Sequence, residues 1–305
     1  MKYPIILFVF KRPELLDDQL DQIKAYNPKS LYIYADGPRN EAEKIATNQV
    51  HLIINKFATQ NKNIHIITKY SAKNIGLKHN IVNGLNYIFH KEAAAIVLED
   101  DCVPSNDFFR FASSMLAKYA NNSRIMSVAG TSVGSYSQSS YDFSRYQLCW
   151  GWATWARAWR LYDPDMKNFR SKDWQITMKR VTKFVHMRWY WDMMLAIVKS
   201  GWLKTWDYQW TYSLFIHDGL AIIPGLNLVS NIGFDKEATN TKVKSNLANM
   251  KRLTLDWPLI HPQSVADNEE LSRVIEAKFY NNWVAIFGML RQYIYWKFNT
   301  YAHRH

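Results

Sequence analysis

The sequence contains little cysteine and no long hydrophobic run. Its two cysteines, Cys102 and Cys149, have no metal-type spacing and are too few for a disulfide framework. We therefore expect a reducing, cytoplasmic setting, with a single bridge between them as the alternative. The first apolar run, at residues 3–10, is too short for a signal-peptide core or a membrane-spanning helix. Low-complexity blocks and fixed-period repeats are absent too, so the sequence favours a folded protein that is not exported.

Acidic residues are outnumbered, because 26 Asp and Glu stand against 38 Lys and Arg, for a formal charge of +12. Hydrophobic residues make up 48% and aromatic residues 15%, which excludes a disordered chain. The positive charge predicts a polyanionic partner: nucleic acid, an acidic membrane or a phosphorylated ligand. No helix-turn-helix, zinc or aromatic-sheet signature accompanies the charge, which disfavours nucleic acid.

The first 130 residues alternate between short apolar runs and helical patterns. Runs rich in β-branched or aromatic residues predict strands at residues 3–10, 30–35, 64–68, 94–98 and 125–129. Apolar spacing of three to four residues predicts helices at 13–26, 40–57, 76–89 and 107–119. This alternation predicts an α/β fold with a mostly parallel, Rossmann-like sheet flanked by helices. Ligands of such sheets bind at the carboxyl ends of the strands.

The character of the chain changes after Gly130. Residues 131–146 are polar and serine-rich, and we predict a loop there. Ten of the thirteen tryptophans follow between residues 150 and 210, among eleven Lys and Arg and five Asp and Glu. That mixture suits sugar stacking, phosphate binding or a membrane interface, and equally an aromatic core with solvated basic faces. Residues 219–234 predict a hairpin, and the range 268–301 contains a predicted long helix.

Three acids, Glu99, Asp100 and Asp101, follow the strand predicted at residues 94–98. Adjacent carboxylates hinder each other's ionisation, so a positive group is expected beside them. The rim of a ligand-binding sheet suits Mg²⁺ or Mn²⁺, which one or two protein carboxylates bind together with substrate phosphates. A solvated acidic turn near a helix start is the structural alternative. A paired-carboxylate hydrolase is the third reading, and the sequence locates no partner acid for it.

Three motifs in a fixed order carry a resemblance to a known family: AIVLEDDCVPSNDFFRF, then CWGWATWARAW, then TWDYQW. Together they resemble nucleotide-sugar glycosyltransferases of the glycosyltransferase A fold. N-acetylglucosaminyltransferase I and related bacterial sugar transferases are the nearest of these. The resemblance spans roughly residues 2–241, and its strength lies in the order and spacing of the motifs, since each is weak alone.

This resemblance implies roles for the acids and for two residues near the start of the chain. Asp101 matches the ligand of a divalent metal, Mn²⁺ or Mg²⁺, while Glu99 and Asp100 match residues that orient the sugar and ribose. Arg12 and Asp36 match positions that hold the nucleotide base, which implies a UDP-sugar donor. Apart from the resemblance, Arg12 is also typical of a surface residue at a helix start, and Asp36 of a turn.

Further residues border the implied donor site. Asn74 and Gly76 resemble a loop that enters a helix beside the donor, where a helix N-terminus can hold an anion. Asn74 as a simple N-cap is the alternative. Lys78 and His79, just behind, are candidates for phosphate or sugar contacts.

The Gly-Trp motif supplies Trp150, Gly151 and Trp152, which match the wall around the donor sugar and acceptor. One departure concerns Asn240, because relatives often have histidine there. If that histidine assists metal or diphosphate binding, Asn240 implies weaker metal affinity or another arrangement.

Asp207 matches the general base of an inverting transfer, which removes the proton of the acceptor hydroxyl. Its neighbours Trp206 and Tyr208 limit hydration and can raise its pKa. A helix-capping aspartate is the alternative. Asp192 repeats the Trp-Asp pair fifteen residues earlier and is kept as a decoy.

The C-terminal segment is aromatic and basic, with no acid after Glu276. It suits an interfacial helix on an anionic membrane, which would bring the protein to a lipid-linked acceptor. A helix packed on the domain explains the same residues.

Taken together, we expect an inverting glycosyltransferase that moves a sugar from UDP-GlcNAc or a related UDP-hexose to a saccharide hydroxyl in bacterial surface polysaccharide, lipopolysaccharide or capsule assembly. Residues 1–130 would form the nucleotide-sugar half, 131–265 the acceptor and catalytic half of the same domain, and 266–305 a helical extension. The expected location is the cytoplasm, with peripheral contact at the inner face of the membrane. A sugar nucleotidyltransferase and a non-catalytic glycan-binding protein are the alternatives.

Overall fold

The computed structural model describes residues 2–167, 169–233, 249–281 and 283–302. Its strands are β1 (Ile5–Val9), β2 (Ser30–Ala35), β3 (His65–Tyr70), β4 (Ala94–Glu99), β5 (Cys102–Pro104), β6 (Ile125–Ala129), β7 (Tyr141–Ser144), β8 (Trp152–Trp155), β9 (Leu220–Pro224) and β10 (Val229–Asn231). Its helices are η1 (Pro13–Leu15), α1 (Leu16–Tyr26), α2 (Glu41–Gln60), α3 (Leu77–Phe89), α4 (Asn106–Lys118), α5 (Ala156–Trp159), α6 (Ser171–Val181), α7 (Val185–Lys199), α8 (Asp207–Ile216), α9 (Glu269–Ile275), η2 (Glu276–Tyr280) and α10 (Trp283–Ala302).

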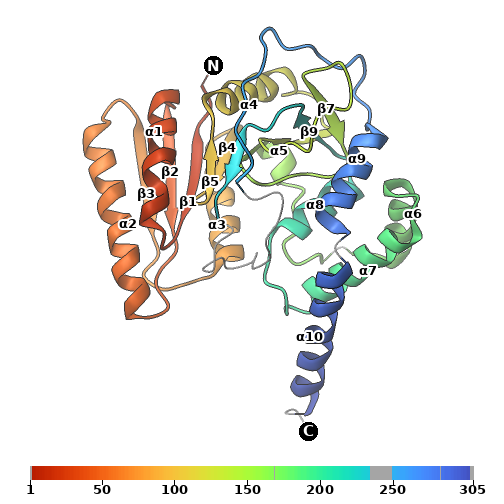
Figure 1. The fold of residues 1–305 in the computed structure, drawn as a ribbon. Helices are drawn as coiled ribbons and strands as arrows, with labels where there is room; N and C mark the ends of the chain where they lie inside the picture. Colours follow the sequence, from red (N-terminus) through yellow and green to blue (C-terminus); the bar gives the residue numbers. More distant parts are fainter. Residues whose placement is uncertain (1, 168, 234–248, 282, 303–305) are drawn as a thin grey trace.

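Within the described residues, eight strands form one sheet in the order β3-β2-β1-β4-β8-β6-β9-β7. Figure 1 shows β3, β2, β1 and β4 at one end of this sheet and β9 and β7 at the other. Only β8 and β7 among them run antiparallel to their neighbours. A separate two-stranded sheet pairs β5 with β10. The α/β fold with a mostly parallel sheet and flanking helices is therefore confirmed.

Two hydrophobic cores lie on opposite faces of the sheet. The strand β1 is buried along its whole length, because alternate side chains serve the two cores. Ile5 and Leu7 pack with residues of α1, α2 and α4, while Ile6 and Phe8 pack with α3 and the tryptophan-rich half. Most of the tryptophans are thus core residues, as one of the two alternatives held. The two cysteines are free thiols, so the alternative of a bridge is wrong.

The elements of the first half follow the predicted ranges closely. Local chemistry sets their starts: the Asn40 side chain accepts from the N–H of Glu43 at the start of α2, and Ser105 accepts from the N–H of Phe108 at the start of α4. The helix predicted at residues 13–26 begins as the short helix η1, with Pro13 in its first turn, and continues as α1.

The second half departs from the predictions in two places. The polar segment 131–146 is not entirely loop, because β7 lies within it and pairs with β9 at the sheet edge. The hairpin predicted at residues 219–234 is wrong: β9 joins the large sheet beside β6, whereas β10 pairs with β5. The two strands therefore belong to different sheets.

The long helix predicted within residues 268–301 is present as α10, which covers the predicted apolar positions from Trp283 onward. The same range begins with the short helix α9 and one π-helical stretch, η2, so Phe279 lies outside the long helix. In Figure 1, α10 extends away from the body of the molecule. No helix in the described part of the chain is both long and apolar enough to span a bilayer. Asn240 lies outside the described residues.

Candidate active site

The acidic triplet forms a tightly held turn between β4 and β5. Glu99 ends β4, and Cys102 begins β5. The amide of Gln19, which is fully buried on α1, donates to the backbone oxygens of Glu99 (2.8 Å) and Cys102 (2.6 Å). The N–H of Phe10 donates to the Asp100 carboxylate at 2.9 Å. A solvated acidic turn is therefore ruled out for Asp100, which is only 9% exposed.

A buried arginine partly balances the three acids. The Arg12 guanidinium lies 3.1 Å from Asp101 Oδ2 and 3.5 Å from Asp100 Oδ1. Arg12 follows β1, the strand next to β4, so the parallel ends of two neighbouring strands bring these side chains together. Arg12 is not a surface residue, since it is 9% exposed. One cation facing three acids leaves the turn with an excess of negative charge.

That excess shows in the pKa values of the triplet. Burial and the charge of Asp101 raise the pKa of Asp100 to about 7, while Arg12 and the N–H of Phe10 oppose the shift. Burial raises the pKa of Glu99 well above its usual range, and the charges of Asp101, Asp100 and Asp207 add to it. No group among the described residues donates a hydrogen bond to the Glu99 carboxylate. A cation or a hydroxyl donor would be favourably placed beside it.

Asp207 comes to the same cluster from a distant part of the sequence. It is the first residue of α8, and the Thr205 hydroxyl donates to its carboxylate. Burial raises its pKa, and hydrogen bonds from Thr205 and from the first N–H groups of the helix oppose the rise. Trp206, not Asp207, is the N-cap of α8, and no side-chain cap bond is present at that position, so the alternative of a helix-capping aspartate is wrong. Asp207 also lies close enough to Glu99 for its charge to raise the pKa of that carboxyl.

A wall of aromatic side chains surrounds Asp207. The Tyr208 hydroxyl is 2.7 Å from that of Tyr190, and the Tyr280 ring lies 5.0 Å from that of Trp191. The charge of Asp207 contributes to raising the pKa values of all three tyrosines, after burial. Tyr280 belongs to the π-helical stretch η2, and no sequence signal placed it at this site.

The Gly-Trp motif lies at the start of β8, at the same edge of the sheet as the acidic turn. Trp152 is 1% exposed and stacks on Trp206, with ring centres 5.3 Å apart, so it is part of the core. Trp150 is half-buried and packs on Phe279 at 5.5 Å. Gly151 has φ +63°, and a Cβ there would come within 2.7 Å of the Val229 side chain. Trp150 is thus the member of the motif that keeps an open surface.

A second glycine packs closely against Asp101, the candidate metal ligand. Gly233 lies beside Asp101, where a Cβ would come within 2.3 Å of the Asp101 Oδ2 atom. The N–H of Ile232 donates to the backbone oxygen of Asp101 at 2.9 Å. Backbone therefore closes one side of the Asp101 carboxylate, and its side chain remains 23% exposed.

Asp36 holds a loop in place. Its carboxylate accepts hydrogen bonds from the N–H groups of Gly37 (2.8 Å), Ile75 (2.8 Å) and Gly76 (2.9 Å), and from the Asn74 amide (3.0 Å). An ionised carboxylate has about four acceptor positions, so the loop donors use them. The N-cap alternative for Asn74 is wrong, because Gly76 is the N-cap of α3. Asp36 thus fixes the loop between β3 and α3 against the end of β2.

Lys78 and His79 make contacts within the protein. The Lys78 ammonium lies 2.8 Å from the backbone oxygen of Pro164 and 3.4 Å from Asp165. The Gln209 amide reaches the same Pro164 oxygen at 3.4 Å. Lys78 therefore links α3 to α8 through this turn. The His79 ring bonds to the backbone oxygen of Ile75 at 3.1 Å.

The carboxylate oxygens of the turn suit a divalent cation whose remaining coordination positions are filled by a substrate. The described part of the chain contains no group of three or more His, Cys, Asp or Glu side chains able to enclose a metal. Mg²⁺ and Mn²⁺ commonly take only one or two protein carboxylates and fill the remaining positions with water and phosphate oxygens. The Asp101 carboxylate is partly exposed, and Glu99 lies among other negative charges. These two side chains therefore fit such a set of metal ligands.

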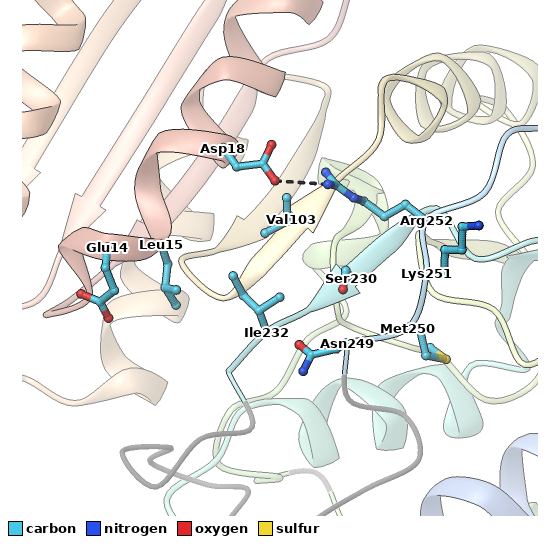
Figure 2. A pocket seen from close by; sticks show the side chains of 10 residues that line it. All are labelled: Glu14, Leu15, Asp18, Val103, Ser230, Ile232, Asn249, Met250, Lys251 and Arg252. Carbon is cyan, nitrogen blue, oxygen red and sulfur yellow. Dashed lines mark hydrogen bonds and ion pairs between the residues drawn. The ribbon is translucent and has the colours of Figure 1, made fainter.

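A separate pocket opens beside the acidic turn, between η1, α1 and the β5–β10 sheet (Figure 2). Its volume is about 430 Å³. The ion pair between Asp18 and Arg252, 3.2 Å apart, closes one side, and Glu14 and Lys251 add charges of both signs. Ile232 lines it and also bonds to Asp101, so this pocket and the acidic turn share the same backbone.

Comparison with known proteins gives only distant similarities. No protein-family model and no curated protein matches the sequence. Among solved structures, mannosyltransferase PcManGT from Pyrobaculum calidifontis, in complex with GDP-Man and Mn²⁺, is 12% identical with a TM-score of 0.39, over 71% of this chain and 69% of that one. GalNAc-T7 with UDP, GalNAc and Mn²⁺ is 9% identical with a TM-score of 0.45, over 74% and 43%. Both are glycosyltransferases.

A nucleotidyltransferase also matches: UDP-glucose pyrophosphorylase complexed with UDP-glucose is 12% identical with a TM-score of 0.29, over 48% of this chain and 64% of that one. This chain spans less than half the length of the GalNAc-T7 chain. The identities and scores are low, so the function proposed below rests on this chain's own residues. The particular likeness to N-acetylglucosaminyltransferase I stays a prediction.

The raised pKa of Glu99 leads to a stability prediction. We expect Glu99→Gln to raise the melting temperature at pH 8 by roughly 2 °C, the shift that about 1 kcal/mol gives a chain of this size. In the unfolded chain, glutamate ionises at its usual pKa of about 4.3. In the folded protein, the Glu99 carboxyl stays protonated up to a higher pH, because its pKa is raised. The folded state with Glu99 thus loses stability as pH rises, and the glutamine variant avoids this loss.

Melting curves at pH 5 and pH 8 measure the effect, and the gain should be larger at pH 8. Glu41→Gln is the control, because Glu41 is an exposed acid at the start of α2 that pairs with Lys44, and this change should not raise the melting temperature. An equal gain at both pH values, or a loss at pH 8, would contradict the assignment of a buried, strained charge to Glu99.

Proposed function

We propose that this chain is an inverting, metal-dependent glycosyltransferase that moves a sugar from a UDP-sugar to a saccharide hydroxyl. The observation that carries the proposal is the meeting of Asp207 with Glu99 and the acidic turn. The charge of Asp207 acts on Glu99, and burial raises the pKa of Asp207, which supports a base near the carboxylates that are proposed to hold a metal and a diphosphate. A shared cluster of this kind meets the chemical needs of a displacement at an anomeric carbon.

In the proposed reaction, the Asp207 carboxylate takes the proton of the acceptor hydroxyl while the hydroxyl oxygen bonds to the anomeric carbon. The bond from that carbon to the diphosphate oxygen breaks, and its electron pair leaves with UDP. Attack opposite the leaving group inverts the anomeric configuration. A divalent metal, when bound, stabilises the charge that develops on the departing diphosphate. The raised pKa of Asp207 makes it a stronger base than a solvated aspartate.

The donor would lie across the carboxyl ends of β1, β2 and β4. Asp101 and Glu99 are proposed to hold the metal with the diphosphate, with Glu99 and Asp100 also facing the sugar and ribose. Arg12 fixes Asp100 and Asp101 by its two ion pairs. We propose that Arg12 and the ordered loop edge around Asp36 border the uracil ring. Trp150 would offer its open surface to the sugar.

The proposed acceptor is a saccharide of a bacterial surface glycan, such as a polysaccharide, lipopolysaccharide or capsule intermediate. The resemblance of the motif order to that of bacterial sugar transferases is the support for this setting. The rival reaction, nucleotidyl transfer, calls for a glycine- and lysine-rich phosphate loop after the first strand. Here Lys11 and Arg12 lead straight from β1 into η1, with no glycine, and Arg12 is engaged by the acidic turn.

A nucleotide panel tests the proposal. We expect UDP to stabilise the protein in the presence of Mn²⁺ more than GDP, CDP or TDP does, and without Mn²⁺ to have little effect. At a UDP concentration a hundredfold above Kd, binding contributes about 2.7 kcal/mol, a rise of several degrees in melting temperature. Differential scanning fluorimetry of the whole chain measures this. Stabilisation by no nucleotide, or equal stabilisation with and without metal, would contradict the proposed donor site.

A further inference from the structure

Helix α2 has one face in the protein core and one face in water. On the inner face, Val50 and Ile54 are fully buried and belong to the core on one side of the sheet. The strand β3 also holds the helix, because the Tyr70 ring stacks on that of His51 at 3.9 Å and the Tyr70 hydroxyl donates to Asn55 at 3.0 Å. The helix is therefore fixed to the body, and its outer face is a rigid surface.

Two large apolar side chains lie at the centre of this outer face. Ile45 is 65% exposed and Leu52 is 69% exposed, the highest values among the large apolar residues at positions 2–130. They are seven residues apart, about two helical turns, so they lie on the same line of the helix and form a small apolar patch. Figure 1 shows α2 at the outer left end of the molecule. A second surface can therefore reach this patch, and burying it would be favourable.

The outer face is arranged symmetrically along the helix. Ile45 lies three positions before Asn48, and both are exposed. Leu52 lies three positions after the exposed Gln49, so the midpoint of the face falls between the two amide side chains. If a second copy of α2 packed antiparallel about a twofold axis at this midpoint, each Ile45 would meet Leu52 of the other copy. A twofold interface uses the same patch of both copies in this way.

Charge favours the same antiparallel arrangement. Glu41 lies four positions before Ile45, and Lys56 lies four positions after Leu52; both charged side chains are exposed. Antiparallel pairing about the same midpoint would place Glu41 of each copy opposite Lys56 of the other, and the two helix dipoles would also be antiparallel. Parallel pairing would instead place like charges opposite each other. The pair that Glu41 makes with Lys44 at 3.3 Å is exposed, so giving it up costs little.

We propose that the outer face of α2 pairs with the same face of a second copy of this chain, in an antiparallel, twofold dimer. Packed helices lie about 8–10 Å apart, which lets Ile45 and Leu52 interdigitate with their counterparts. The helix has 20 residues, a length of about 30 Å, so the interface is modest and a Kd in roughly the micromolar range is expected. The inference does not depend on the proposed transfer reaction, because it uses no residue of the candidate active site.

Sedimentation equilibrium of the whole chain, from about 1 μM to about 100 μM, tests the pairing. Each copy has a formal charge of +12, so the salt concentration is set at about 0.15 M, where repulsion beyond about 8 Å is screened. We expect a monomer–dimer equilibrium. Ile45→Ser together with Leu52→Ser should raise the Kd roughly tenfold or more, because four apolar side chains per dimer lose their burial. The matched control is Ile176→Ser with Val185→Ser, residues that are 69% and 73% exposed on α6 and α7, and it should leave the Kd unchanged.

A charge exchange tests the antiparallel register separately. Glu41→Lys alone and Lys56→Glu alone should each raise the Kd about fivefold, because two opposite-charge pairs per dimer become repulsive. The two changes together should restore the parent Kd, since the opposite charges then exchange places across the interface. A chain that stays monomeric over the whole concentration range would overturn the proposal, and would leave the face to a different partner. A dimer that Ile45→Ser with Leu52→Ser leaves intact would also overturn it, as would a failure of the combined charge change to restore the Kd.

Discussion

Asp207→Asn is expected to lower the turnover of sugar transfer by roughly 100-fold to 10,000-fold, the contribution of a positioned general base. Asparagine keeps the size of the side chain and can still bond to Thr205, but it cannot accept the acceptor's proton. Donor binding should not change, because the metal and the diphosphate are proposed to bind at Asp101 and Glu99 and not at Asp207. Steady-state rates with a UDP-sugar, combined with UDP thermal shifts, separate the two effects.

The chain provides a close control in its second Trp-Asp pair. Asp192 follows Trp191 on α7, is exposed, and accepts a hydrogen bond from the Trp174 indole at 2.6 Å. Asp192→Asn should transfer sugar at the parent rate. If Asp192→Asn lost turnover and Asp207→Asn retained it, the base would be wrongly assigned.

The pH profile gives the same assignment an independent readout. A base works only when ionised, so the parent rate should fall as pH drops through the raised pKa of Asp207. That acid limb should lie above the usual range of aspartate, near 3.9. The residual activity of Asp207→Asn should lack this limb. A parent profile flat down to pH 4 would argue against a buried base.

Asp101→Ala is expected to abolish the Mn²⁺-dependent stabilisation by UDP and to lower transfer by roughly 100-fold or more. Without this carboxylate, the turn keeps Glu99 and Asp100, of which Asp100 is engaged by Arg12 and the N–H of Phe10. The remaining groups supply too few open oxygens for a metal. Thermal shifts with a Mn²⁺ titration measure the loss directly.

Asp21→Ala serves as the control, since Asp21 is an exposed acid on α1 away from the turn. It should retain the full shift with UDP and Mn²⁺. A binding protein that uses only its aromatic and basic surfaces would tolerate both changes equally. A full metal-dependent shift in Asp101→Ala would therefore favour that alternative and remove Asp101 from the metal site.

The first half of the fold was predictable because parallel strands buried on both faces are continuous apolar runs. β1 and β4 show this pattern, and their helices have clear caps or proline starts. The second half was harder to predict. β8 has four residues, Trp152 to Trp155, inside a long aromatic stretch, and β7 lies in a serine-rich segment. Their strand character comes from neighbours in space, not from local pattern.

Part of the candidate active site could also be predicted from the sequence. The order of the motifs pointed to the acidic turn and to Asp207, and elementary sheet topology placed Arg12 beside the acids. The contacts that fix these groups were not visible. Gln19 clamps the turn from α1, and Tyr280 reaches Asp207 from η2, but a single glutamine or tyrosine carries no signal of its partner.

The position of β8 has a consequence for how the molecule forms. β8 separates β4 from β6, although both precede it in the chain, and it pairs with each through only a few residues. Until the ribosome has released β8, β4 and β6 have no strand between them and each presents an open edge. A fragment that stops at residue 130 would keep that exposure permanently, and open edges invite pairing with other chains. The central part of the sheet can therefore become continuous only after β8 has been made, about halfway through synthesis.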